Sequence, residues 1–230
     1  MVYEFVTPSI IKCNNFLPPT TLGKVWEDIL NTKDRFHIPE WGKPEQKAKV
    51  AVNTTEHYSH LCGGMDWWDE NAPTIATLPD WILHQGLISL IHEQSPKNVF
   101  NLIPKFTWLW SVHLITYNKG GYYNWHQDHV TYLKTGPGGG RQAHNNLFTA
   151  NVVLQQPSSL KGGEALFMDG GIREEPHKNN TMYLFPSYIP HAVKTLEGEE
   201  EVTFEEQRFS VQFWFGYDNL ETNKTGHQYY

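Results

Sequence analysis

The stretch that decides both fold and chemistry reads Tyr122-Tyr123-Asn124-Trp125-His126-Gln127-Asp128. It opens a segment, continued to residue 130, whose composition predicts a β-strand. Residues two apart on an extended strand point to the same face, so His126 and Asp128 could bind one ion. One further histidine would complete a site of two histidines and one carboxylate. That ligand set leaves open positions on the metal and suits non-haem Fe(II).

The third ligand has several candidates among the twelve histidines of the chain. We place His191 first, because it enters a strand directly after an apolar strand and turn and could face into a barrel. Any one of the rivals, taken alone, is better explained as a structural histidine. His113 lies on the expected strand before the one that carries His126, and His129 directly follows Asp128. The other two rivals, His144 and His177, lie in polar loops. The strongest rival is His113.

The N-terminal part of the chain has helical patterning. Apolar residues recur at helical spacing over about 21–33, with Thr20 or Thr21 as the expected cap. A second helix is expected over about 80–94, capped by Asp80. Between them, the adjacent Trp67 and Trp68 are interpreted as packing residues, with a substrate-groove wall as the alternative.

From residue 106 the pattern changes to short apolar, β-branched and aromatic runs separated by glycine and proline. Strands are expected at about 106–117, 122–130, 147–155, 164–168, 181–185, 189–195 and 202–215. Many short strands with turn signals, after a helical part, favour a sandwich or jelly roll. The glycine-rich loop at 135–140 lacks the Lys and Ser/Thr of a phosphate-binding loop. It is interpreted as a linker, with a lid as the alternative.

We therefore expect a mostly β (α+β) fold, a double-stranded β-helix (jelly roll) with N-terminal helices packed against its major sheet. Residues 1–105 would form a helical and loop support region of the same domain. Residues 106–216 would form the jelly-roll catalytic core, and residues 217–230 a polar tail.

Composition limits the function classes. The net charge of -7 and the pI of about 5.9 give no generally basic surface, so nucleic acid is a disfavoured partner. Cys13 and Cys62 are expected to be free thiols in a reducing compartment. The start of the chain shows no signal-peptide pattern, and no apolar run is long enough to span a membrane. These features predict a cytoplasmic protein, and they leave its oligomeric state open.

A second polar group of residues follows near the end of the chain. Alternation on the expected last strand puts Arg208, Ser210, Gln212 and Trp214 on one face. One interpretation is a solvent-facing side of the strand. The other is an arginine inside a barrel that pairs bidentately with a ligand carboxylate.

Together these residues resemble the Fe(II)- and 2-oxoglutarate-dependent dioxygenases, and in detail their prolyl 4-hydroxylase-like branch. The resemblance covers roughly residues 106–216, with a weaker likeness at residues 11–18. Its motifs are Tyr117 before a glycine turn, Tyr123 before His126-x-Asp128, Gly162-Gly163-Glu164, Phe185-Pro186 before His191, and Arg208 before Trp214. The chain departs from the family in a longer step from His191 to Arg208, which fits an acidic hairpin at 197–206. It also has Val153 where some relatives have tyrosine.

The resemblance implies a role for each matched residue. His126, Asp128 and His191 would bind Fe(II), and Arg208 would pair with the distal carboxylate of 2-oxoglutarate. The same co-substrate pocket would be completed by Tyr117, Ser210 and Asn151, and the substrate pocket would be lined by Tyr123 and Trp214.

The implied activity is hydroxylation of an unactivated C–H bond with release of succinate and CO2. Its cofactors would be Fe(II), 2-oxoglutarate and O2, with ascorbate as a candidate reductant. The first-choice substrate is a prolyl residue in a peptide or protein, and the alternative is a free amino acid or small metabolite. Demethylation of nucleobases is disfavoured, because Trp214 stands where that branch has a second arginine. A jelly-roll metal-binding protein without 2-oxoglutarate turnover is the non-oxygenase alternative.

Overall fold

A computed structural model of the chain describes residues 2–36, 48–49, 51–55, 73–75, 77–78, 108–133, 142–200 and 202–217. Four expectations lie outside these residues: the helix at 80–94, the paired tryptophans, the glycine-rich loop and most of the C-terminal tail. Within the described part, no helix is both long and apolar enough to span a membrane.

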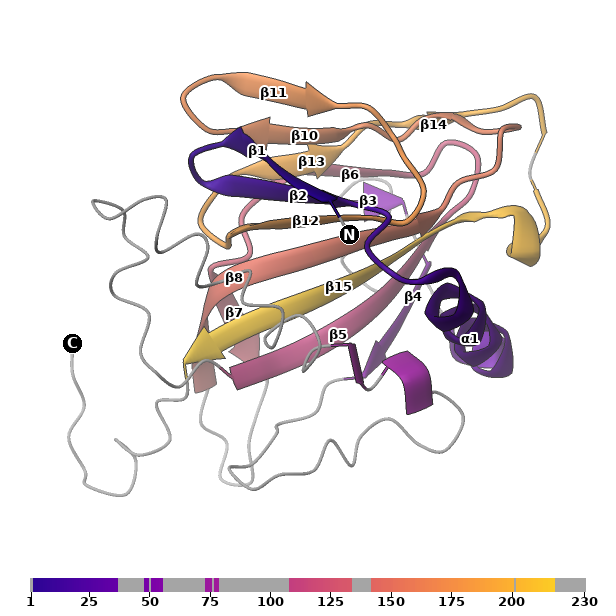
Figure 1. The fold of residues 1–230 in the computed structure, drawn as a ribbon, viewed down its shortest axis with the longest axis horizontal. Coiled ribbons are helices and arrows are strands. Elements are labelled where there is room, and N and C mark those ends of the chain that lie inside the picture. Colours follow the sequence, from indigo (N-terminus) through magenta and orange to yellow (C-terminus); the bar gives the residue numbers. More distant parts are fainter. Residues whose placement is uncertain are drawn as a thin grey trace.

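The larger of two antiparallel sheets has eight strands (Figure 1). Its order is β1 (Val2–Thr7), β2 (Ile10–Asn14), β12 (Thr181–Pro186), β8 (Gln142–Gln155), β15 (Arg208–Tyr217), β5 (Trp108–Tyr117) and β4 (Ala51–Thr55), with β7 (Val130–Leu133) paired to β8. Strands far apart in sequence are therefore neighbours, as a jelly roll requires.

The smaller sheet has five strands among the described residues, and its strands β11 and β10 lie at the top of Figure 1. Its order is β11 (Ile172–Glu175), β10 (Ala165–Met168), β13 (His191–Val193), β6 (Tyr122–His126) and β3 (Ala48–Lys49). A separate two-stranded ribbon pairs β9 (Lys161–Gly162) with β14 (Leu196–Glu197). Two facing antiparallel sheets confirm the predicted mostly β, jelly-roll fold.

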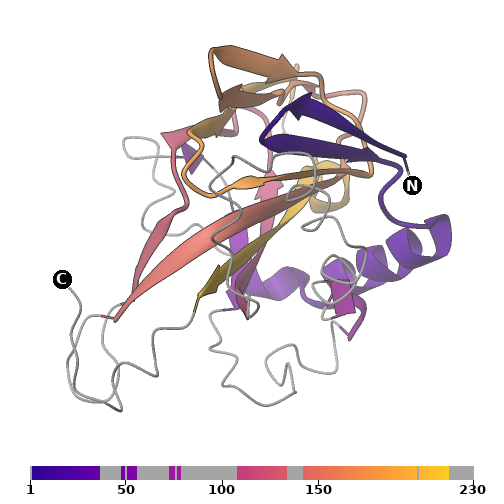
Figure 2. The ribbon, with the colours of Figure 1, turned by 60° about the vertical axis from the view of Figure 1, so that its left-hand side comes forward.

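Helix α1 (Pro19–Asn31) covers part of the outer face of the larger sheet (Figure 2). Val25 and Ile29 are fully buried there, and the ring of Trp26 lies edge-on to Phe209, with centroids 5.1 Å apart. The expected cap at Thr20 or Thr21 is wrong. The helix starts at Pro19, which has no N–H to leave unsatisfied in the first turn, after Pro18 as the cap residue.

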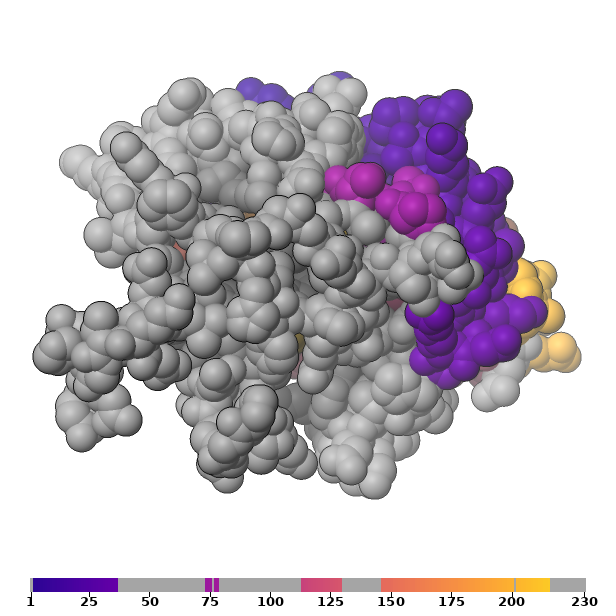
Figure 3. All heavy atoms as spheres, turned by 90° about the horizontal axis from the view of Figure 1, so that it is seen from below, coloured from indigo at the N-terminus to yellow at the C-terminus, as the bar shows by residue number. Residues whose placement is uncertain are grey.

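Residues 73–75 and 77–78 lie directly beside α1 (Figure 3). The Asp28 carboxylate of α1 accepts hydrogen bonds from the backbone N–H groups of Thr74 and Ile75, both at 2.8 Å. This contact joins a distant part of the N-terminal region to the helix.

Three predicted strands have different bounds in the structure. The strand expected at 122–130 is interrupted after His126, and β7 begins only at Val130, so Asp128 lies between strands. The strand expected at 147–155 starts earlier, which puts His144 on β8 and not in a loop. The strand expected from 202 starts at Arg208, because Phe204–Glu206 forms a short 3-10 helix closed by a capping box between Thr203 and Glu206.

Both faces of the larger sheet are covered. Along β8, Ala150 and Val152 point to the core beneath α1, whereas Val153 points into the space between the sheets. Since successive strand residues alternate between faces, Thr149 and Asn151 share the inner face with Val153. The inner face therefore carries polar side chains inside the barrel.

Candidate metal and co-substrate site

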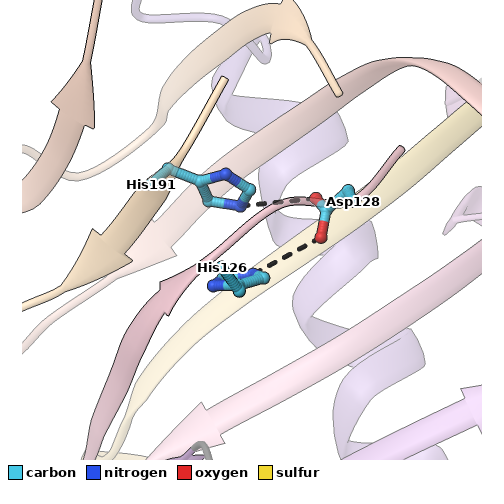
Figure 4. A group of neighbouring side chains, drawn as sticks. All are labelled: His126, Asp128 and His191. Carbon is cyan, nitrogen blue, oxygen red and sulfur yellow. Dashed lines mark ion pairs between the residues drawn. The ribbon is translucent and has the colours of Figure 1, made fainter. Parts of the chain in front are cut away.

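His126, Asp128 and His191 come together inside the barrel (Figure 4). Their ligand atoms all lie within 4.8 Å of one another. The antiparallel pairing of β13 with β6 places His191 directly opposite His126. Asp128 lies just past the end of β6, where its backbone N–H donates to the carbonyl of Ser187 at 2.8 Å. The third ligand selected from the sequence therefore lies beside the other two.

Both histidines direct the same nitrogen toward Asp128. The Nδ1 atom of His126 lies 2.8 Å from the carbonyl oxygen of Asn124, and that of His191 lies 3.0 Å from the carbonyl oxygen of Ile189. A carbonyl only accepts, so Nδ1 carries the proton and Nε2 is left with a lone pair. Metal-binding histidines are commonly oriented by such a contact.

Asp128 faces the two free nitrogens. His126 Nε2 lies 3.4 Å from Oδ1, and His191 Nε2 lies 3.3 Å from Oδ2. The buried Nε2 of His191 nevertheless has no hydrogen-bond partner in the described part of the chain. Two ring nitrogens and a carboxylate that converge in this way fit a bound cation.

The electrostatics of the cluster also favour a positive charge. Burial alone would raise the pKa of Asp128, but the two histidines more than offset it and hold this pKa well below its ordinary value. Burial lowers the pKa of His191, and the Asp128 carboxylate more than offsets that effect and raises it. Asp128 is therefore ionised and ready to act as an anionic ligand.

Arg208 lies deeper in the same barrel with 1% of its surface exposed. Its Cζ atom lies 4.7 Å from the ring centroid of Tyr117, and burial lowers its pKa. Among the described residues, its Nε and Nη1 atoms have no hydrogen-bond partner, and no carboxylate lies within ion-pairing distance. A buried, uncompensated guanidinium is costly, so this group fits an anionic ligand.

Two other buried polar atoms on β15 and β8 also lack partners. Ser210 Oγ and Asn151 Oδ1 are buried and make no hydrogen bond within the described ranges. Tyr117 is 1% exposed, and burial raises the pKa of its hydroxyl despite the opposing charge of Arg208. Arg208 and Ser210 on β15 thus lie on strands adjacent to Tyr117 on β5 and Asn151 on β8.

Tyr123 and Trp214 contact the residues of the ligand cluster. The ring of Tyr123 stacks on His126 with centroids 4.1 Å apart, and burial raises the pKa of its hydroxyl. Trp214 contacts the His113 ring at 4.3 Å and donates a hydrogen bond to Asp128 Oδ2 at 3.1 Å. Trp214 thus donates a hydrogen bond to Asp128, whereas the sequence predicted only that it would line the substrate pocket.

Three of the four rival histidines are described, and none of these three belongs to the ligand cluster. His113 is buried against Trp214, and burial lowers its pKa to about 4. His129 is exposed. His177 lies in the loop before β12, where burial and the charge of Arg208 lower its pKa to about 4. The side chain of His144 is outside the described residues.

Sequence reasoning missed two side chains that donate to Asp128 and a third that contacts one of them. Thr149 and Gln212 both donate to its Oδ2 atom at 2.9 Å, and Ser187 lies 3.0 Å from the Thr149 hydroxyl. The sequence signal that could have found Thr149 and Gln212 is the alternation of side chains along a strand. It places Thr149 on the inner face of β8 and Gln212 on the polar face of β15. Their convergence on Asp128 depends on the pairing of β8 with β15.

The comparisons with known proteins agree with this geometry. Residues 112–216 match the model of the 2OG-Fe(II) oxygenase superfamily. The comparison with curated protein sequences found no match.

Solved structures share the fold at low sequence identity. A Trichoplax adhaerens prolyl hydroxylase in complex with a hypoxia inducible factor peptide fragment has a TM-score of 0.60 and 15% identity, covering 96% of this chain and 89% of that one. The structure of OsALKBH1 has a TM-score of 0.59 and 13% identity, with coverages of 93% and 99%. The viral collagen prolyl hydroxylase from Paramecium Bursaria Chlorella virus-1 has a TM-score of 0.51 and 15% identity, with coverages of 91% and 97%.

The fold is therefore the double-stranded β-helix of the oxygenases, with a two-histidine, one-carboxylate cluster inside it. The part of the chain that carries this cluster is thus similar to the 2OG-Fe(II) oxygenase superfamily. Its cofactors are accordingly Fe(II), 2-oxoglutarate and O2, and the cluster of His126, Asp128 and His191 fits the iron.

Proposed function

We propose that this oxygenase hydroxylates an unactivated C–H bond, and that a prolyl residue in a peptide or protein is its substrate. His126, Asp128 and His191 would hold the iron, and Arg208 would pair with the distal carboxylate of 2-oxoglutarate. One observation carries the proposal: buried Arg208, whose Nε and Nη1 atoms have no hydrogen-bond partner among the described residues, lies in the same barrel as the ligand cluster.

The remaining residues would orient the co-substrate and keep water out. Ser210 and Asn151 offer buried polar atoms that a second carboxylate or a keto group could contact. Tyr117 covers one face of the guanidinium. When bound, iron and 2-oxoglutarate supply the oxidising chemistry, in which O2 gives one oxygen atom to succinate and one to the hydroxylated carbon, with loss of CO2.

The prolyl substrate is supported by the motifs of residues 106–216 and by the fold shared with prolyl hydroxylases. The same fold is found in a protein named OsALKBH1, so fold alone does not select a substrate. A free amino acid or small metabolite is the second substrate class to test.

The test of the oxygenase site is an anaerobic titration of the chain with Fe(II) and 2-oxoglutarate. We expect the visible metal-to-ligand charge-transfer band of the ternary complex. Arg208→Met should abolish the band at 2-oxoglutarate concentrations that saturate the wild type, and His126→Ala should abolish it through loss of metal. The exposed Arg173 provides the matched control, because Arg173→Met should leave the band unchanged.

A metal-binding protein without oxygenase function would bind Fe(II) and show no such band. If the band is present, succinate release should be measured over a panel of prolyl peptides, their alanine-substituted versions and free amino acids. Release coupled only to free amino acids would overturn the prolyl substrate and leave the oxygenase site standing.

A further inference from the structure

The two oxygen atoms of the Asp128 carboxylate have very different surroundings. Oδ2 accepts hydrogen bonds from Thr149 Oγ1 at 2.9 Å, Gln212 Nε2 at 2.9 Å and Trp214 Nε1 at 3.1 Å. In the described part of the chain, the nitrogen atom close to Oδ1 is His126 Nε2, at 3.4 Å. His191 Nε2 lies 3.3 Å from Oδ2, so Oδ2 has one histidine beside its three donors, and Oδ1 faces the other histidine.

The Thr149 contact has a defined direction. An ionised carboxylate only accepts, so the Thr149 hydroxyl must donate to Asp128. Its lone pairs are then free to accept from the Ser187 hydroxyl, which lies 3.0 Å away. Thr149 and Ser187 are both completely buried, so water does not compete with this chain of hydroxyls.

The other two donors come from a single strand. Gln212 and Trp214 are two residues apart on β15 and therefore share a face. The backbone on the opposite side of Asp128 is also fixed, because its N–H donates to Ser187 at 2.8 Å and its carbonyl accepts from Asn146 at 2.6 Å. The carboxylate thus has little freedom to rotate.

We infer that Thr149, Gln212 and Trp214 are positioning residues that hold Asp128 as a one-oxygen metal ligand. This inference rests on the proposed function of the cluster as an iron site. With Oδ2 engaged by three hydrogen-bond donors, Oδ1 is the oxygen that accepts none of these bonds and is left for the metal. A carboxylate that turned to bind through both oxygens would take a position that the co-substrate or O2 needs. The three donors also spread the carboxylate charge away from the metal.

The test compares variants that differ in the donor but not in shape. Thr149→Val keeps the volume and removes the hydroxyl, whereas Thr149→Ser keeps the hydroxyl. Trp214→Phe removes the indole N–H and keeps a ring against His113. Its control is Trp26→Phe on α1, which packs against Phe209 on the outer face of the sheet.

The measurements are anaerobic Co(II) titrations and the visible d–d spectrum of the Co(II) complex, which reports coordination number. We expect Thr149→Val and Trp214→Phe to bind Co(II) roughly 10- to 100-fold more weakly than the wild type. Their Co(II) spectra should change, and the Fe(II)–2-oxoglutarate band should move. Thr149→Ser and Trp26→Phe should match the wild type in all three measurements.

Unchanged Co(II) affinity and spectrum in both Thr149→Val and Trp214→Phe, while the wild type binds metal, would overturn the inference alone. Failure of the wild type to bind Co(II) or form the charge-transfer band would instead overturn the proposed function. If Thr149→Val does not fold, as judged by circular dichroism, Gln212→Met replaces it beside Trp214→Phe. The same affinity loss and spectral change are expected, and their absence in that pair counts against the inference.

Discussion

At the scale of single residues, Gly162 is fixed by both its backbone conformation and its surroundings. Its φ angle is +78°, and a Cβ atom would lie 2.2 Å from the backbone oxygen of Thr195. Gly170 has a similar φ of +67° but open space around it. We expect Gly170→Ala to cost about 1 kcal/mol from backbone strain alone, and Gly162→Ala at least about 3 kcal/mol, because the strand contact must also shift. Urea denaturation measures both, and equal costs would contradict this account.

His113 makes stability depend on pH. Burial lowers its pKa to about 4 in the folded chain, against an ordinary value of 6.5. The unfolded chain therefore binds more protons between these two values, so the free energy of unfolding falls as pH falls through this window. The free energy of unfolding that is lost through protonation of His113 is at most about 3 kcal/mol.

The matching experiment is urea denaturation of His113→Gln and wild type at pH 7 and pH 4. The wild type should lose more stability on acidification than His113→Gln. The exposed His129 supplies the control, and His129→Gln should follow the wild type. An equal loss in wild type and His113→Gln would contradict the prediction.

Residue types and their spacing singled out His126 and Asp128 and made His191 and Arg208 candidates. They could not separate His191 from His113 by physics alone, because both lie in apolar strands. The pairing of β13 with β6 decides between them. Thr149 and Ser187 were out of reach for a related reason, since their role depends on which distant strands become neighbours.

At the scale of elements, the β1–β2 hairpin links the edges of the two sheets. Lys12 on β2 lies 2.7 Å from the Glu175 carboxylate on β11, and the two side chains are 11% and 17% exposed. We expect Lys12→Met to cost about 2 kcal/mol, because it leaves a largely buried carboxylate without its cation. The exposed Lys24 on α1 is the matched control, with an expected change within about 0.5 kcal/mol.

A double-variant measurement separates the ion pair from packing. Glu175→Gln should recover part of the stability lost in Lys12→Met, because no unpaired buried charge then remains. Denaturant unfolding of the single and double variants gives this coupling. If the double variant is as unstable as the sum of the two single changes, Lys12 contributes only through its apolar stem.

Element boundaries were the least predictable part of the fold. The Thr203-x-x-Glu206 spacing is a capping-box signature, and the β-rich pattern around it concealed the 3-10 helix that it closes. Strand β1 was not expected at all, because residues 2–7 become a strand only by pairing with β2, which pairs with the distant β12. Long-range pairing of this kind leaves little local signal.

At the scale of the whole molecule, the metal site joins the two sheets. His126 and His191 lie on strands of the smaller sheet, while the donors that hold Asp128 come from β8 and β15 of the larger one. A ligand bound at this junction interacts with the folded barrel and not with either sheet alone. Metal binding should therefore stabilise the chain against global unfolding.

We expect Mn(II), a stand-in for Fe(II) that resists oxidation, to raise stability by about 2.7 kcal/mol at 100 times its dissociation constant. For a domain of this size, that corresponds to a rise in Tm of roughly 5–10 °C, reversed by a chelator. His191→Ala should lose this rise. Arg208→Met should keep it but lose the additional rise that 2-oxoglutarate gives the wild type. If Arg208→Met responded to 2-oxoglutarate as the wild type does, the co-substrate would not depend on that guanidinium, and the carboxylate pocket would have to lie elsewhere in the barrel.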